Sequence, residues 1–296
     1  MIVRIAAAQY PIDAIASWDS YADKIAHWVR DASQDGARLL LFPEYGAMEL
    51  ARSFAPEVWS DLQQSIDFVG AMRGKIDALH ASLAEQHDVV IVAASLPERD
   101  EDGVAHNVAR VVSPKGRIGE QRKLMMTRFE REQWHVAGGD AVNVFKTPAG
   151  TFGVAICYDS EFPLIARAMS EAGASMILVP SCTDSAHGYH RVRVAAQARA
   201  LENQCYVVQS PTVGEALWSP AVDVNVGAAG VFGPPDLGFP ADGVVALGEM
   251  NQTAWLYADL DLAAVARVRR EGKVLNNKHW AEQPGAAPLK ANVVEL

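Results

Sequence analysis

The chain has 296 residues, half of them hydrophobic, and a formal net charge of −10 from 36 acidic and 26 basic residues. No basic patch stands out to bind a nucleic acid, and no apolar run approaches the roughly 20 residues that span a bilayer. The cysteines, 3 in number, do not make a disulfide framework, and no two have the C-x-x-C spacing of a zinc site. We therefore expect a cytoplasmic protein that holds no metal and has neither a nucleic-acid nor a membrane partner.

Apolar runs bounded by turn residues alternate with helical periods in the first half of the chain. The expected strands cover residues 3–9, 38–44, 88–96, 106–113 and 117–123. One expected helix covers residues 18–34 and ends at Asp35-Gly36, since glycine tolerates the left-handed conformation of a helix C-cap. A long helix is predicted from an apolar face at nearly helical spacing, formed by Leu62, Ile66, Val69, Ile76, Leu79 and Leu83.

The second half continues the same alternation. Its expected strands cover residues 143–147, 150–157, 174–181, 205–210, 228–234, 243–249 and 253–260. Helices are expected over about 163–172 and 190–203, with a short one near Ala263. Because composition does not break along the chain, we expect a single domain over residues 1–272. The polar tail over residues 273–296 is expected to pack at a subunit interface.

The way the expected strands are connected indicates the fold class. Strands joined through helices favour parallel neighbours, whereas a close pair such as residues 109–120 favours an antiparallel hairpin. The sequence therefore predicts an α/β fold with mixed sheets. Several strands are too apolar for one side to face water, which indicates that two mixed β-sheets pack face to face.

Three expected strands end on a reactive side chain, namely Glu44, Lys123 and Cys157. In sheets of this kind chemistry lies beyond the carboxyl ends of the strands. A carboxylate can take the proton of a thiol, while an ammonium can lower the thiol's pKa and then stabilise an oxyanion. The backbone N–H of Tyr158, just after the cysteine, is a natural second oxyanion donor. Taken alone, each side chain has an ordinary structural explanation: a solvated glutamate, a surface lysine, a small core cysteine.

In their local contexts these residues resemble a known family. "FPE" at 42–44, "RK" at 122–123 and "CYDSEFP" at 157–163 are similar, in this order, to the three signature motifs of the nitrilase superfamily of carbon–nitrogen hydrolases. The resemblance runs from about Ile2 to Leu260. It implies a four-layer αββα sandwich, usually assembled as a homodimer or higher homo-oligomer. It also implies that Glu44 is the general base, Lys123 the oxyanion stabiliser and Cys157 the nucleophile.

The segment "KLMMTRFEREQW" at 123–134 resembles a pattern in which a second glutamate helps to position the lysine or the substrate. Its place, seven residues after the lysine, makes Glu130 the match and Glu132 the neighbouring rival. Trp134 is expected to pack beneath this loop and not to touch substrate.

Further candidates border the expected pocket. "HGYH" at 187–190 leaves open a cysteine–histidine hydrolase or a metal pair, but no third ligand stands in an obvious position. We instead expect a loop and helix start that border the pocket, with His187 or Tyr189 contributing to its wall and His187 contacting substrate. Ser181 and Thr183, at another strand exit, are also expected to bind substrate. Cys182 is expected at the pocket wall and Cys205 in the core.

Two other features receive structural interpretations. Asp159 and Glu161 follow the cysteine just before a helix begins, where acidic residues are favourable, so we interpret both as capping residues. The glycine-rich segment at 227–236 lacks the strand–G-x-G-x-x-G–helix setting of a dinucleotide site. It is expected to form a turn and strand near the pocket rim.

The sequence predicts cysteine-dependent hydrolysis of a non-peptide C–N bond in a small molecule, without a cofactor. The lysine motif is similar to that of true nitrilases, whereas Tyr-Asp after the cysteine is similar to amidase-like branches, and the second feature favours a linear amide. Nitriles and N-carbamoyl compounds remain alternatives. The chain also resembles nitrilase-like units fused to acetyltransferases. A non-catalytic interaction module is the alternative of a different class.

Overall fold

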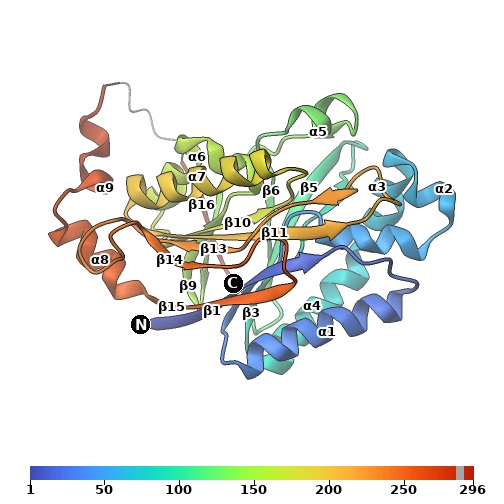
Figure 1. Ribbon diagram of the computed structural model, residues 1–296, viewed down its shortest axis with the longest axis horizontal. Helices are drawn as coiled ribbons and strands as arrows, with labels where there is room; N and C mark the ends of the chain where they lie inside the picture. Colours follow the sequence, from blue (N-terminus) through green and yellow to red (C-terminus); the bar gives the residue numbers. More distant parts are fainter. Residues whose placement is uncertain (285–289) are drawn as a thin grey trace.

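The computed structural model describes residues 1–284 and 290–296 (Figure 1). The strands in this part of the chain are β1 (Ile2–Pro11), β2 (Leu39–Leu41), β3 (Val90–Val92), β4 (Leu96–Arg99), β5 (Ala105–Val112), β6 (Ile118–Arg122), β7 (Val136–Ala137), β8 (Asn143–Thr147), β9 (Gly150–Val154), β10 (Met176–Ser181), β11 (Tyr206–Glu215), β12 (Val224–Asn225), β13 (Gly230–Phe232), β14 (Val244–Leu247), β15 (Ala254–Asp261) and β16 (Asn292–Glu295). The helices are α1 (Trp18–Gln34), η1 (Gly46–Ser53), α2 (Pro56–Trp59), α3 (Leu62–Ala71), α4 (Arg73–His87), α5 (Arg128–Glu132), η2 (Cys157–Glu161), α6 (Pro163–Glu171), α7 (Ala186–Asn203), α8 (Leu262–Glu271), α9 (Asn276–His279) and η3 (Trp280–Glu282).

The strands join into one curled mixed sheet, so the predicted mixed α/β fold is confirmed. Its main path runs β16-β8-β9-β10-β11-β1-β2-β3-β5-β4. Neighbours such as β1 and β2 or β9 and β10 are parallel, whereas β5 and β6 form the expected antiparallel hairpin. β1 and β11 pair only at Tyr10–Thr212 and Pro11–Val213, so the two halves of the sheet are joined at one end and diverge at the other.

Alternation along β1 divides the hydrophobic core into two clusters. Val3, Ile5 and Ala7 belong to a cluster that includes β9, β10, β11, α6 and α7. Ala6 and Ala8, on the opposite side of the strand, belong to a second cluster with α1 and α4. Figure 1 accordingly shows α6 and α7 on one side of the strands and α1 and α4 on the other.

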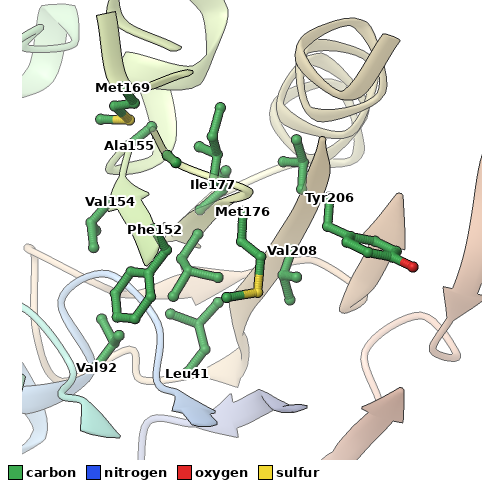
Figure 2. Close-up of a cluster of buried hydrophobic side chains, with 14 of the residues drawn as sticks. Leu41, Val92, Phe152, Val154, Ala155, Met169, Met176, Ile177, Tyr206 and Val208 are labelled. Atoms are coloured by element: carbon green, nitrogen blue, oxygen red, sulfur yellow. The ribbon is translucent and has the colours of Figure 1, made fainter. Parts of the chain in front are cut away.

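Side chains from the two halves of the sheet meet inside the first cluster (Figure 2). Phe152 of β9 and Met176 of β10 point toward Val92 of β3 and Leu41 of β2. All four side chains are buried. Burial of large apolar side chains on both faces of these short strands explains why their sequences contain so few polar residues.

Two expected helices have different bounds in the structure. The predicted helix over residues 62–83 is two helices, because Met72 ends α3 and begins α4. Gly70 packs against the backbone of Pro97 and Glu98 in β4, which holds the end of α3 close to the sheet. The helix expected from residue 190 begins one turn earlier, as α7, because the side chain of Ser185 accepts the N–H of Gly188 as an N-cap.

The described parts of the C-terminal tail pack on the same chain. β16 pairs with β8 in parallel register, and Lys146 and Glu295 form an ion pair of 2.7 Å at this edge. Arg167 of α6 stacks over the ring of Trp280, 5.1 Å from its centroid. Residues 285–289, which fall within the predicted interface tail, lie outside the described residues. Of the helices in the described part, none is long and apolar enough to cross a membrane.

Candidate active site

The three strand-end residues come together, as does the second glutamate. Glu44 follows β2, Lys123 follows β6, and Cys157 begins η2 directly after β9. Glu130 lies on the short helix α5, which begins just beyond the lysine. All four side chains are at least 96% buried. The curled sheet therefore gathers at one point residues that are more than a hundred positions apart in the chain.

Lys123 lies between two carboxylates. Its Nζ atom donates to Glu44 Oε1 at 2.7 Å and to Glu130 at 2.7 Å (Oε2) and 2.8 Å (Oε1). The side-chain amide of Asn107 donates to the same Glu44 oxygen at 3.0 Å, and the carbonyl of Asn107 accepts the backbone N–H of Lys123. The lysine and the first glutamate are thus held from both main chain and side chains of β5.

Glu130 is fixed by its own helix and by an aromatic hydroxyl. Thr127 is the N-cap of α5, and its backbone N–H and hydroxyl both donate to Glu130 Oε2 at 2.8 Å, completing a capping box. The hydroxyl of Tyr45 donates to Glu130 Oε1 at 2.8 Å. The rival residue Glu132 instead forms an exposed ion pair with Arg128 at 2.8 Å.

Cys157 has a left-handed backbone conformation with φ of 48°, which is costly for a residue other than glycine. Its thiol lies 3.8 Å from the carbonyl oxygen of Cys182, whose backbone N–H donates to Glu44 Oε2 at 3.0 Å. The peptide of Cys182 therefore connects the thiol with the glutamate. A sharp turn that costs backbone energy is a common way to present a nucleophile at the end of a strand.

The pKa shifts within this cluster follow from burial and from neighbouring charges. Burial raises the pKa of Glu44, although Lys123 opposes the shift. Burial also favours the neutral form of Glu130, but Lys123 and the hydrogen bonds from Thr127 and Tyr45 outweigh it and lower the pKa of this carboxyl. For Lys123, the two carboxylates overcome burial and raise its pKa well above the usual value. The ammonium is therefore charged at neutral pH.

The thiol of Cys157 is not a preformed thiolate. Burial and then the charge of Glu44 raise its pKa well above the ordinary value, and Lys123 opposes them only in part. A neutral thiol needs a base at the moment of attack. A carboxylate with a raised pKa, such as that of Glu44, is able to take the proton of a neutral thiol.

These groups line a cavity of about 480 Å³. Its lining residues, besides the four above, are Tyr45, Thr127, Arg128, Phe129, Gln133, Trp134, Tyr158, Glu161, Cys182, Thr183, Asp184, Gly188, Arg191, Val192 and the segment 220–224. A volume of this size accommodates a small molecule. No group of three or more His, Cys, Asp or Glu side chains able to hold a metal ion occurs in the described residues.

The expected substrate-binding residues differ in where they lie. Tyr158 and Thr183 line the cavity. Ser181 is fully buried, and its hydroxyl donates to the carbonyl of Ser210 at 3.3 Å, away from the cavity. His187 lies at the start of α7, as expected, but it is exposed and does not line the cavity, and the neighbouring Gly188 lines it instead.

Several residues of the site were not singled out from the sequence or were interpreted differently. Neither Tyr45 nor Asn107 belongs to one of the motifs, and only the contacts of these two residues reveal their place in the site. Asp159 accepts the N–H of Ile156 as a capping residue does, but its carboxylate also reaches the backbone beyond Lys123.

Two expectations need correction, the capping role of Glu161 and the place of the glycine-rich segment near the pocket rim. The residue before α6 has no side-chain cap, and Glu161 instead lies at the cavity rim, 3.4 Å from Arg191. The glycine-rich segment at 227–236 contains the buried strand β13, which pairs with β11 and β14. Residues 220–224, just before that segment, line the cavity where the rim was expected. Cys205 is buried, as expected.

A thiol beside a carboxylate that can take its proton and an ammonium that can stabilise an oxyanion are groups able to support hydrolysis by a cysteine nucleophile. The family profile described as Carbon-nitrogen hydrolase matches residues 4–270. The chain belongs to this family of enzymes, within the nitrilase superfamily that its motifs resemble.

Curated and solved relatives agree with this assignment. Probable hydrolase YhcX of Bacillus subtilis (strain 168) is 35% identical over 272 residues, which cover 92% of this chain and 52% of that protein. Omega-amidase NIT2-B of Xenopus laevis is 24% identical over 277 residues, 90% of this chain and 92% of its own. The crystal structure of a carbon-nitrogen hydrolase from Helicobacter pylori G27 has a TM-score of 0.73 at 22% identity, covering 91% and 92% of the two chains. This chain thus spans about half the length of the Bacillus protein and nearly all of the other two.

Proposed function

We propose that this enzyme hydrolyses a small linear amide to a carboxylic acid and ammonia through a thioester formed on Cys157. The observation that carries the proposal is the contact of Lys123 with both Glu44 and Glu130 beside that thiol, at the wall of the 480 Å³ cavity. The similarity to omega-amidase NIT2-B of Xenopus laevis, an amidase by name, supports the choice of an amide.

In the first half of the cycle, the Cys157 sulfur attacks the amide carbon as the thiol proton passes to Glu44. The carbonyl oxygen becomes an oxyanion, which Lys123 and the backbone N–H of Tyr158 stabilise. When the C–N bond breaks, the nitrogen takes the proton back from Glu44 and leaves as ammonia. In the second half, water gives a proton to Glu44 and attacks the thioester, and the thiol is released with the acid.

Glu130 has a separate task in this proposal. Its lowered pKa keeps it charged beside the ammonium, so that Lys123 remains protonated while Glu44 gains and loses a proton. Two carboxylates with pKa values shifted in opposite directions are a common arrangement where one exchanges protons and the other holds a fixed charge.

A panel of linear amides, nitriles and N-carbamoyl compounds tests the reaction, with released ammonia as the measurement and Cys157→Ala as the control. We expect ammonia from amides with the unmodified enzyme and none above background with the variant. Faster turnover of nitriles or N-carbamoyl compounds would replace the amide assignment. If no compound of the panel releases ammonia and iodoacetamide does not label Cys157, a non-catalytic interaction module would be favoured.

We further infer that the sheet halves and their covering helices form a four-layer αββα sandwich, which the two core clusters on opposite sides of β1 support. We also propose a cytoplasmic homodimer formed through α6, α7 and the tail. Leu164 and Val194, which are 43% and 63% exposed on those helices, are apolar side chains that such an interface would cover. Sedimentation velocity tests the dimer, and a monomer at micromolar concentration would contradict it.

A further inference from the structure

Asp159 occupies an unusual position for a capping residue. Its carboxylate is buried, with 1% of the residue exposed. Oδ1 accepts the backbone N–H groups of Leu124 at 3.0 Å and Met125 at 2.7 Å, and Oδ2 accepts that of Ile156 at 3.2 Å. A single side chain therefore binds two segments that are separated by about thirty residues in the sequence.

The first of these segments directly follows Lys123. The lysine's own N–H donates to the carbonyl of Asn107, and its carbonyl accepts the N–H of Gly139. The peptide between Lys123 and Leu124 is thus held on both sides, its carbonyl by Gly139 and its N–H by Asp159, which also binds the N–H of Met125. The carboxylate therefore contributes to the direction in which the chain leaves the lysine, and with it to the point from which the ammonium is presented.

The second segment directly precedes Cys157, whose left-handed backbone needs support from its surroundings. The hydroxyl of Ser160 donates to the carbonyl of Cys157 at 2.6 Å, and Asp159 fixes the N–H of Ile156 on the other side of the turn. Both flanks of the strained residue are thus tied to η2.

We propose that Asp159 is a positioning residue that locks the segment after Lys123 to the turn that carries Cys157, so that the ammonium and the thiol keep a fixed separation. Its effect on turnover rests on the function proposed above. Its effect on the thiol does not, because the position of the sulfur is a property of the resting protein.

Burial raises the pKa of Asp159 to about 7, but Lys123 and the three backbone N–H groups oppose that shift and favour the ionised carboxylate. Three N–H groups arrive from two directions, and a carboxylate offers only acceptors on both oxygens. Asparagine at this position has one oxygen and one NH2 group. Its oxygen can accept the N–H groups on the Leu124 side or the N–H of Ile156, but its NH2 group then faces the remaining backbone N–H, and two donors cannot bond to each other. A buried donor left without an acceptor is unfavourable, so one of the two segments is displaced.

Asp159→Asn is therefore the informative substitution, and Asp236→Asn is its matched control. Asp236 also accepts three backbone N–H groups from two segments, namely those of Leu237, Lys273 and Val274 at 2.6, 2.9 and 3.3 Å. It does not line the cavity. The two variants lose similar contacts to backbone N–H groups at places that differ in their distance from the thiol and in burial, since Asp159 is buried and Asp236 is partly exposed.

Three quantities are measured for each variant: kcat and KM on the best amide of the panel, the rate of iodoacetamide modification of Cys157 read by peptide mass, and the melting temperature. For Asp159→Asn we expect kcat per folded molecule to fall by about 10- to 100-fold with KM changed less than about threefold, because displaced groups slow chemistry more than binding. Modification of Cys157 slows by at least about fivefold. For Asp236→Asn only the melting temperature changes.

An unchanged kcat and an unchanged modification rate in Asp159→Asn, with a lowered melting temperature, would overturn the proposal. If this variant does not fold, Asp159→Glu keeps the charge on a longer arm and is expected to lose kcat and thiol reactivity in the same way. Failure of both to fold, beside a folded Asp236→Asn, would assign Asp159 to folding and overturn the proposal. A slower thiol in a chain that releases no ammonia from any amide would keep the positioning role and reject the proposed function.

Discussion

Two buried clusters in this chain contain the same three groups, a lysine, a glutamate and a tyrosine. In the first, here called the α1 cluster (Tyr10, Asp13, Lys24 and Glu49), the tyrosine donates to Glu49 Oε1 at 2.5 Å and Lys24 of α1 donates to Oε2 at 2.6 Å. In the second, the cavity cluster (Glu44, Tyr45, Lys123, Glu130 and Cys157), Tyr45 and Lys123 contact Glu130 in the same manner.

The clusters differ in what else the lysine contacts. Lys24 also pairs with Asp13, whose side chain is 53% exposed, whereas Lys123 also pairs with Glu44, whose side chain is 2% exposed. Glu44 in turn lies beside a thiol and a cavity. In the α1 cluster, the lysine–glutamate–tyrosine contacts therefore serve to connect α1 with η1. Adding a second buried carboxylate and a cysteine gives the cavity cluster the groups for proton transfer.

The largest contrast is expected from removing the two lysines. Lys123→Met should lower kcat by at least about 100-fold, because an oxyanion donor is lost. Lys24→Met should leave kcat per folded molecule within about twofold while lowering the free energy of unfolding by about 3 kcal/mol, since Glu49 is left without its cation. Ammonia release and urea unfolding measure the two effects. Equal loss of activity in both variants would contradict the distinction.

Neutralising the glutamates gives the next contrast. Glu130→Gln should reduce kcat by about 10-fold or more, because Lys123 then shares its proton with Glu44 alone. Glu49→Gln should reduce stability by about 1–3 kcal/mol and leave kcat unchanged. The same two assays apply, and a Glu130→Gln enzyme with unchanged kcat would remove this residue from the proposed mechanism.

The tyrosine hydroxyls should show a smaller effect. Tyr45→Phe and Tyr10→Phe each remove one hydrogen bond to a buried carboxylate and should each cost about 1.5–3 kcal/mol in unfolding free energy. Only Tyr45→Phe should also lower kcat, by about three- to tenfold, through the loosened Glu130. Identical kcat values in the two variants would show that this hydroxyl stabilises the fold alone.

The two glutamates should also differ in the pH dependence of stability. Burial, opposed by Lys24, raises the pKa of Glu49 above 4.5, so its contribution to stability is largest at low pH and falls as pH rises through that raised value. The pKa of Glu130 is lowered, so its contribution is complete above about 4.5 and is lost as pH falls. Urea unfolding between pH 3.5 and 6 compares each Gln variant with the unmodified protein. The assigned pKa shifts would be contradicted if the difference in unfolding free energy between variant and unmodified protein changed with pH in the same direction for both glutamates.

The sequence predicts the parts of this molecule that depend on local pattern. Apolar runs bounded by turn residues locate most strands, and Glu44, Lys123 and Cys157 stand out because each ends an expected strand within a motif. The break at Met72 is not predictable in the same way, since apolar side chains continue on both sides of it. The start of α7 was expected at residue 190, although Ser185 is a local N-cap signal from which the earlier start could have been found.

The rest of the site depends on tertiary contacts. Tyr45 and Asn107 reach the cluster only because β2, β5 and α5 meet, and neither side chain has a motif. Asp159 looks like a capping residue when only its own segment is considered, because the N–H groups of Leu124 and Met125 come from elsewhere in the chain. Exposure of His187 and burial of Ser181 likewise follow from the orientation of a helix and a strand.

Trapping the covalent species tests the central claim most directly. In the proposed cycle the thioester on Cys157 forms before water attacks it, so rapid acid quenching of the unmodified enzyme during turnover of the best amide should preserve the thioester for peptide mass spectrometry. We expect the peptide that contains Cys157 to gain the mass of the acyl group, with no gain in the Cys157→Ala variant. Ammonia release by a Cys157→Ala enzyme at the unmodified rate, or an acyl group found on another residue, would contradict the account.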